Sequence, residues 1–436
     1  MTTDTQHSLE RSYIESYSKA NNEPEWFTNF RLSALEKMDT LEMPKPDKTK
    51  IDRWNFTSFK QHTVTNQAYN SVDELPEEVK ALLDLEGEVT NLYVQRNQTP
   101  ALLKVSETLK EKGVIFTDLL TAVKEHPELV QKYLMTEAVK VDEHKLAAFH
   151  AALVNGGVFL YVPKNVQVEE PVQAIFVQDN ADAPLINHVL IVADTNSSVT
   201  YVENYLSIDV ETEGVANIIA EVVVNEGANV KFGAVDTLAS GITTYVNRRG
   251  YTEKDARLEW SLGLMNDGDT ISENITNLYG DGSVGDAKTV VAGTGKQTEN
   301  FTTAVINHGK KSEGYILKHG IAKENSTIIF NGIGKIEHGA SGANAQQESR
   351  ALMLSEKARA DANPILLIDE DDVQAGHAAS IGRVDPIQLY YLQSRGIPKD
   401  EAERLIIHGF LAPVVTQLPI EGVKKQLTEV IERKIR

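Results

Sequence analysis

The chain has 436 residues, of which 41% are hydrophobic and 24% are charged, with a formal net charge of -20 and no cysteine. The acidic balance argues against a nucleic-acid backbone or an anionic membrane as the main partner. The lack of thiols excludes disulfides, thiolate zinc sites and a cysteine nucleophile. Neither an apolar signal segment nor a membrane-spanning run of about 18 apolar residues is evident, so we expect a cytoplasmic protein with no membrane or nucleic-acid partner.

The first 150 residues predict a mostly helical N-terminal region. Phe27, Ala34 and Met38 recur at helical spacing after Pro24, which marks a helix start. A Pro-Lys-Pro run at 44–46 then ends this helix. The aromatic segment 51–56 that follows indicates a surface stretch pinned to the core by its Trp and Phe side chains.

The stretch from residue 73 to residue 149 also favours helices. Apolar pairs such as Leu102-Leu103 and Leu119-Leu120 stand at helical steps. His144 and His150 lie here, and we interpret them as structural groups, because a metal site needs several donors that converge.

Residues 151–370 predict a β-solenoid core. Four short β-type runs, at 198–203, 229–233, 256–260 and 283–287, begin about 27 to 31 residues apart, a period that suits stacked coils. Each run follows a turn that contains Gly227, Asp255 or a neighbouring Gly, Asn or Asp residue. The fold class we expect is therefore mainly β.

Two glycine-rich stretches imitate nucleotide-binding motifs. Residues 280–285 fit G-x-G-x-x-G, but a strand-like run follows where a dinucleotide site needs a helix N-terminus. The stretch 293–296 lacks the P-loop's first glycine, since Val290 stands there, and Gln297 replaces the Ser or Thr that holds magnesium. The chain should bind no ATP by itself.

An acidic group at Asp267, Asp269 and Glu273 raises an enzymatic alternative. Some β-helix proteins cleave polysaccharides with two carboxylates about 5 to 9.5 Å apart. In a chain with 63 acidic residues, a solvated turn is the more economical interpretation. A β-helix carbohydrate-active enzyme nevertheless stays as the second function class.

Residues 371–436 predict a C-terminal helical segment. Asp385 caps a first helix and Gly396 ends it in left-handed geometry. A second helix begins near Pro398 and closes at Pro413, and a third begins near Pro419. The third helix carries one apolar stripe, which either caps the open end of the solenoid or docks a partner. The stripe consists of Ile420, Val423, Leu427, Val430, Ile431 and Ile435.

Several motifs occur in one order along the chain. They are EPEW at 23–26, RWNF at 53–56, NGGVFLYVP at 155–163, FNGIGKI at 330–336, SRALMLS at 349–355, NPILLI at 363–368, DDVQAGHAASIG at 371–382, YYLQSRGI at 390–397 and LPIE at 418–421. Together they resemble the SufB/SufD family of iron–sulfur cluster assembly proteins, and most closely its SufD members.

The resemblance implies a right-handed parallel β-helix flanked by N-terminal and C-terminal helical segments, without enzymatic activity. It also implies a scaffold subunit that pairs with a SufB-like paralogue and docks a SufC-like ATPase through its C-terminal helices. A homodimer is a further possibility. The chain alone should hold no cofactor tightly, whereas a transient iron–sulfur cluster or iron could lie at the interface with the SufB-like chain.

The same resemblance places a cluster-assembly site at His377, with Gly376 and Gln374 beside it. Many SufD relatives have Cys and Gly where this chain has Ala375 and Ala378, so no thiolate is offered here. His377 would then be the metal ligand. The alternative is structural: its ring bonds the backbone of a strand-to-helix turn after the last strand, 364–368. The residues we assign to ATPase binding are Tyr391, Arg395, Gly396, Leu405, Ile406 and Phe410.

Overall fold

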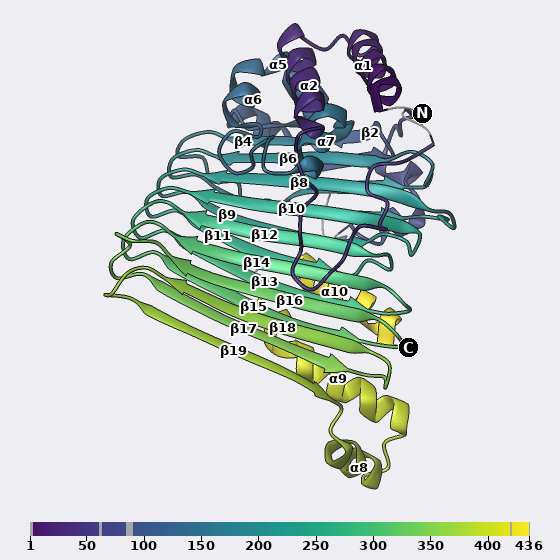
Figure 1. Cartoon of the computed structure of the whole chain (residues 1–436), viewed down its shortest axis with the longest axis vertical. Coiled ribbons are helices and arrows are strands. Elements are labelled where there is room, and N and C mark those ends of the chain that lie inside the picture. Colours follow the sequence, from purple (N-terminus) through teal and green to yellow (C-terminus); the bar gives the residue numbers. More distant parts are fainter. Residues whose placement is uncertain (1–2, 61–62, 84–89, 419–420, 436) are drawn as a thin grey trace.

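The structure is a computed structural model that describes residues 3–60, 63–83, 90–418 and 421–435. Its centre is a parallel β-helix whose coils stack along the long axis of the molecule (Figure 1). Two sheets form its walls, and we call them sheet A and sheet B. Strands within each sheet are parallel, except for the antiparallel pairs β1–β2 and β3–β4. The predicted mainly β solenoid with helical flanks is confirmed.

Sheet A contains ten strands. In spatial order they are β19 (Gln374–Arg383), β17 (Asn344–Met353), β15 (Glu313–Ala322), β13 (Val284–Gly293), β11 (Arg257–Leu264), β9 (Asn229–Thr237), β7 (Ser198–Ser207), β5 (Val172–Gln178), β1 (Leu92–Arg96) and β2 (Thr99–Lys104).

Sheet B contains nine strands. In spatial order they are β18 (Arg359–Ile368), β16 (Thr327–Ile336), β14 (Thr298–Asn307), β12 (Thr270–Leu278), β10 (Ile242–Thr252), β8 (Gly214–Val224), β6 (Leu185–Ala193), β4 (Gly156–Val162) and β3 (Ile115–Asp118).

Helices gather at the two ends of the chain. They are α1 (Thr3–Ala20), α2 (Glu25–Met38), α3 (Glu77–Lys80), α4 (Glu107–Glu111), α5 (Leu119–Glu125), α6 (Pro127–Tyr133), α7 (Lys145–Leu153), α8 (Pro386–Ser394), α9 (Lys399–Val415) and α10 (Glu421–Ile435), with one 3-10 turn at Val72–Glu74. No helix in the described ranges is long and apolar enough to cross a membrane.

The turns of the β-helix lie where the sequence predicts them. Gly227, Asp255 and Gly282 adopt φ values of 67°, 53° and 70°, the left-handed region that Gly and Asp tolerate best. The four predicted runs begin β7, β9, β11 and β13. The G-x-G-x-x-G stretch is therefore a coil turn that leads into a strand, and it opens no helix.

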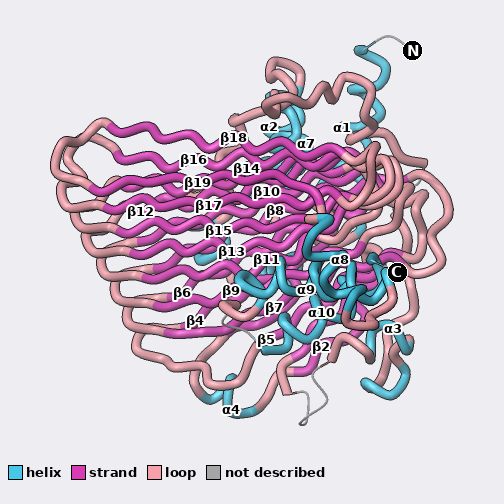
Figure 2. The backbone as a smooth tube through the Cα atoms, turned by 90° about the horizontal axis from the view of Figure 1, so that it is seen from below, coloured by secondary structure: helices cyan, strands magenta, loops and turns pink. Residues whose placement is uncertain are grey.

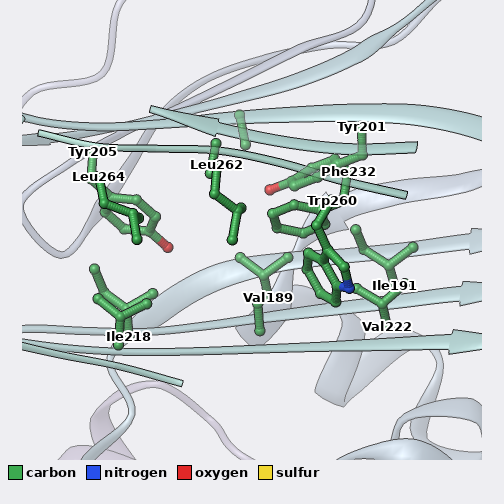
Figure 3. Close-up of a cluster of buried hydrophobic side chains, with 14 of the residues drawn as sticks. Val189, Ile191, Tyr201, Tyr205, Ile218, Val222, Phe232, Trp260, Leu262 and Leu264 are labelled. Atoms are coloured by element: carbon green, nitrogen blue, oxygen red, sulfur yellow. The ribbon is translucent and has the colours of Figure 1, made fainter. Parts of the chain in front are cut away.

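The lumen of the β-helix is a packed core rather than a channel (Figure 3). Tyr201, Phe232 and Trp260 come from successive strands of sheet A, and their rings lie 5.2 Å and 4.8 Å apart between centroids. All three are fully buried. Complete burial of one such side chain contributes about 1.5–3 kcal/mol, so this stack is a main source of coil-to-coil stability.

A charged knot also lies in the lumen. The Arg248 guanidinium on β10 donates to Glu203 on β7 at 2.8 Å and to Asp236 on β9 at 2.9 Å. All three side chains are buried. Burial raises the pKa of Glu203 to about 7, against the opposing effect of Arg248.

The N-terminal region is less helical than predicted, because it adds three strands to the β-helix. Leu102 and Leu103 belong to β2, and not to a helix. A tight turn at Asn97, with φ of 51°, folds β2 back on β1 and gives these apolar residues a sheet to pair with. The predicted helix after Pro24 is confirmed as α2, but it ends at Met38, before the Pro-Lys-Pro run at 44–46 that we expected to end it.

The two histidines that we interpret as structural have structural contacts. His144 caps α7 by accepting from the backbone N–H of Ala147. His150 is buried between Asn217 and His188, with nitrogen contacts of 2.9 Å and 3.1 Å. Burial lowers the pKa of His150 well below its usual value. These contacts fix α7 on sheet B.

An extended segment, residues 43–58, runs from the N-terminal helices over the outer face of sheet B, and we call it the strap (Figure 1). Ile51 and Phe56 are buried in it and pack with Tyr245 and Ile271 of sheet B. Trp54 packs partly buried beside them. The predicted surface segment pinned by aromatic side chains is confirmed.

Helices α9 and α10 pack on the outer face of sheet A (Figure 2). Leu427 of α10 lies so close to β11 that a Cβ added at Gly263 would stand 2.0 Å from its Cδ2 atom. The apolar stripe of α10 therefore packs on the side of the β-helix and does not cap its open end. Pro419 and Ile420, assigned to the start of this helix, lie outside the described residues.

Helix α9 continues past Pro413, so the prediction that this proline closes the helix is wrong. The proline lies in the last turn, so the single N–H bond that it cannot donate is lost near the end of the helix. Thr416 still donates its backbone N–H to the Ala412 carbonyl at 2.9 Å.

Candidate partner interface and cluster-assembly site

His377 lies on β19, the last strand of sheet A. We expected the final strand to end at residue 368 and His377 to follow in a strand-to-helix turn, and this placement is wrong. Residues 374–383 belong to the β-helix because their backbone pairs in parallel register with β17, where Gln347 faces His377. The β-helix therefore extends beyond the expected boundary at residue 370.

The His377 side chain is exposed, as is Gln374, while Gly376 is half-buried. Within the described part of the chain, no hydrogen bond or ion pair engages the imidazole. Position 376 has no room for a larger side chain, because a Cβ added at Gly376 would lie 2.5 Å from Gln346 Oε1. The ring is thus free to bind, and it makes none of the backbone bonds that the structural alternative requires.

Polar side chains lie in the lumen on β17 and β15, the two strands that follow β19 in sheet A. Lys318 on β15 is fully buried and donates to the Asn331 carbonyl at 2.8 Å. Burial lowers the pKa of Lys318 to about 7. Gln347 is also buried and donates to the Ile365 carbonyl at 2.7 Å. His377 therefore marks the exposed end of an interior that becomes polar toward its last coil.

The last coil, β18 and β19, is open. Each of these strands has a sheet neighbour on one side only, and Figure 1 shows them at the end opposite the N-terminal helices. Nearly all side chains of β19 are exposed. Leu367, Ile368 and Ile381 are 46%, 38% and 38% exposed. A long open edge with apolar side chains is a template for pairing with another strand.

The two corners of this coil carry opposite charge. The turn 369–372 between β18 and β19 has the sequence Asp-Glu-Asp-Asp. The other corner carries Lys357, Arg359 and Arg383, together with Glu356 and with Asp361, which pairs with Arg359 at 2.7 Å. Arg383 reaches across this corner and donates to the Glu356 carbonyl at 3.1 Å. The open end therefore carries negative charge at one corner and a small excess of positive charge at the other.

A hollow of about 470 Å³ lies beside β19 and is lined by Gly376, Ala378 and Gln417, among others. Among the described residues, no group of three or more His, Cys, Asp or Glu side chains could hold a metal ion. The described residues around His377 therefore form no complete metal site.

Helix α8 presents an apolar surface to solvent. It has no buried residue, and Ile387, Tyr390 and Tyr391 are exposed. The Arg395 guanidinium stacks on the Tyr391 ring at 5.1 Å. Gly396 ends the helix with φ of 87°, as predicted, and Asp385 caps it by accepting from the Ile387 N–H.

The residues predicted for partner binding on α9 divide into two groups. Leu405 is exposed. Phe410 instead stacks on His319 of β15 at 5.0 Å, and its carbonyl lies 2.8 Å from His319 Nδ1. Ile406 is half-buried. Phe410 therefore belongs to the contact between α9 and the β-helix, since the helix turns that face inward.

Comparison with known proteins accounts for the whole chain. Residues 176–410 match the family model "SUF system FeS cluster assembly, SufBD core domain", and residues 7–174 match "SufBD protein N-terminal region". The chain belongs to the SufBD family. The "Iron-sulfur cluster assembly protein SufD" of Bacillus subtilis (strain 168) is 67% identical over 437 residues, covering 100% of both chains.

More distant SufBD proteins align over nearly the same length. The "Iron-sulfur cluster assembly SufBD family protein" of Staphylococcus epidermidis is 28% identical over 426 residues, which covers 96% of this chain and 91% of the relative. A Staphylococcus aureus protein of the same description has the same identity and coverage. The resemblance inferred from the sequence motifs is thereby confirmed.

The carboxylates that suggested a glycosidase have other partners in this SufBD chain. Asp267 pairs with Lys434 of α10 at 2.8 Å, and Asp269 accepts from the Thr298 N–H at 2.7 Å. Glu273 accepts from the Tyr245 hydroxyl at 2.8 Å. Each carboxylate is committed to a structural contact, which disfavours the carbohydrate-active alternative.

Sequence reasoning missed part of the exposed surface. Ile387 and Tyr390 are among the most exposed apolar side chains of the described chain, at 77% and 73%. Their spacing with Tyr391 along a helix was visible in the sequence as a signal. The opposite charges of the last coil were not, because the two corners lie apart in sequence and only the strand order brings them to one edge.

Proposed function

We propose that this chain is a non-catalytic subunit of a SUF-type iron–sulfur cluster assembly complex. In it, the open end of the β-helix pairs with a SufB-like paralogue, and α8 with the exposed side of α9 docks a SufC-like ATPase. The observation that carries the proposal is the open last coil, which combines unpaired strand edges, opposite corner charges and an unengaged histidine in one place.

Pairing at the open end follows from what the edge leaves unsatisfied. The outer backbone groups of β18 and β19 have no strand to bond among the strands that the structure describes, and a second β-helix of the same family offers a matching edge. An antiparallel arrangement brings the acidic corner of one chain to the basic corner of the other. Complementary charges of this kind favour the correct register and speed association.

His377 lies at the junction that such pairing creates. A neutral imidazole is a suitable ligand for iron, and histidine can replace cysteine on cluster iron. The iron or cluster is here the product under assembly, so it need not stay bound to this chain. The partner supplies the remaining ligands, because the described part of this chain offers no group of three or more His, Cys, Asp or Glu side chains that could hold a metal ion.

The ATPase surface is assigned to Ile387, Tyr390, Tyr391 and Leu405. These side chains are exposed on α8 and α9 while the inward side of α9 is fixed on sheet A. Aromatic side chains are favoured at the centres of interfaces. Tyr390→Asp should therefore weaken the binding of a SufC-like ATPase by at least about tenfold. Leu103→Asp, which changes an exposed apolar residue on β2, should not weaken it.

The decisive experiment measures iron in the assembled complex. His377→Ala should leave pairing and folding intact but sharply lower the iron bound after anaerobic reconstitution, measured by elemental analysis together with the cluster absorbance. His338→Ala is the matched control, because His338 is an exposed histidine that lies outside β19. Normal iron content and normal cluster transfer by the His377 variant would overturn the assignment.

A further inference from the structure

The strap joins the N-terminal region to the open end of the β-helix. Its tip, at Asp47 and Lys48, is held by Asn300 of β14, whose side-chain amide donates to the Asp47 carbonyl and to Thr49 Oγ1, both at 2.7 Å. Lys48 adopts φ of 60°, so the chain reverses sharply here. The tip is therefore a fixed turn on the outer face of sheet B.

A ladder of three asparagine amides continues from this tip to the edge of sheet B. Asn331 of β16 donates to Asn300 Oδ1 at 2.9 Å, and Asn363 of β18 donates to Asn331 Oδ1 at 2.8 Å. The last acceptor of the ladder, Asn363 Oδ1, is taken by the Lys48 ammonium. Lys48 thus ends the amide ladder, and its exposed positive charge stands at the open edge.

Asn363 is the fifth of the ten residues of β18. This central position fixes where Lys48 lies in any antiparallel pair formed by two β18 edges. Opposite residues of an antiparallel pair point to the same face. The lumens of the two β-helices are continuous only if side chains that point to the same face lie opposite each other. Odd-numbered residues of β18 must therefore lie opposite odd-numbered residues of the partner strand.

Two registers meet this condition and keep the strands nearly fully overlapped. One places Asn363 opposite the same residue of the second copy, and the other places it opposite the position of Ile365. In these two registers, Lys357 lies opposite Asp369 or Asp371 of the second copy, so opposite charges are paired at the corner. The two Asn363 side chains are then direct or diagonal neighbours, about 5 to 8 Å apart.

The tips of the two straps would meet at the same place. In a pair of identical chains the two Lys48 ammonium groups face each other across the axis, and like charges placed opposite one another on a sheet are destabilising. We propose that Lys48 is a specificity-determining residue of the pairing interface. It disfavours a second copy of this chain and favours a SufBD-family β-helix that presents a carboxylate or no charge at this position.

This inference rests on the pairing proposed for the open end, and a charge-swap experiment separates the two. Wild-type and Lys48→Glu chains with different mass tags are mixed at tens of micromolar, and native mass spectrometry counts the pairs. In an equal mixture the ratio of mixed pairs to like pairs is one when pairing is random. This ratio should rise by at least about threefold at low salt and return to one at high salt, because screening removes exposed charge interactions.

The matched control is Lys50→Glu. It makes the same change in charge on the strap, two residues from the tip, without removing a ladder contact. Mixing it with wild type should give the statistical share. A random share with Lys48→Glu, an equal excess with Lys50→Glu, or no pairs in any mixture would overturn the role of Lys48. Pairing with a SufB-like paralogue, measured separately by the same method, decides the proposed function.

Discussion

The contact between Leu427 and Gly263 allows the docking of α10 to be tested quantitatively. A methyl group at position 263 would stand 2.0 Å from Leu427 Cδ2 and 3.0 Å from its Cγ, and Leu427 is fully buried. The side chain has no solvent-filled space to move into. Gly263→Ala should therefore force α10 outward and cost about 1–3 kcal/mol, as overpacking does elsewhere.

Leu427→Ala should cost about 2–5 kcal/mol through the cavity that it leaves. In the double variant, the methyl at position 263 occupies part of that cavity, so the two losses should not add. We expect a coupling free energy of at least about 1 kcal/mol in favour of the double variant. Gly382→Ala is the control, because a Cβ there meets nothing within 4 Å.

Hydrogen exchange of the α10 amides is the appropriate measurement, since a stacked β-helix need not unfold in one step. Exchange in α10 should accelerate in each single variant and less than additively in the double variant. Additive losses, or protection of α10 unchanged by Gly263→Ala, would refute the packing argument.

Three further predictions concern single side chains. Burial raises the pKa of Glu299 to about 8, so the folded state holds this proton more tightly than the unfolded state does. The stability that this provides is complete below the usual pKa of 4.5 and is lost as pH rises to about 8, at roughly 1.4 kcal/mol per pKa unit. Glu299→Gln should therefore raise the thermal midpoint at pH 8.5 and flatten its pH dependence, whereas exposed Glu211→Gln should do neither. Gly396→Ala should destabilise α8 by about 1 kcal/mol because of its φ of 87°, while Gly409→Ala, inside α9, should not. Asp385→Ala should cost α8 about 0.5–2 kcal/mol, and unchanged exchange of the α8 amides would contradict it.

The solenoid could be predicted because its turns have a recognisable sequence pattern. Gly227, Asp255 and Gly282 occupy left-handed positions that few residues tolerate, and they recur with the period of a coil. Strand β19 was missed for the opposite reason. Its Ala, Gly and Ser residues have little β propensity, and the strand exists because β17 offers it a backbone partner.

The site could be predicted only where residues close together in the sequence determine it. His377 and Tyr391 stood out through motifs, and Gly396 through its role at a helix end. The inward turn of Phe410 depends on how α9 lies on sheet A, a contact with His319 across 91 residues. The strap's approach to β18 joins Lys48 to Asn363 across 315 residues. Helical and strand periodicity carry no information at such separations.

The charged knot in the lumen has a consequence for how the coils are assembled during folding. Glu203, Asp236 and Arg248 come from three different strands, and each points inward because of its place in the alternation of the strand. Winding β10 a single residue out of step would turn Arg248 outward and leave Glu203 and Asp236 buried without a counterion, at a cost of several kcal/mol. An apolar lumen would accept such a slip far more readily. The knot therefore acts as a checkpoint against miswound coils.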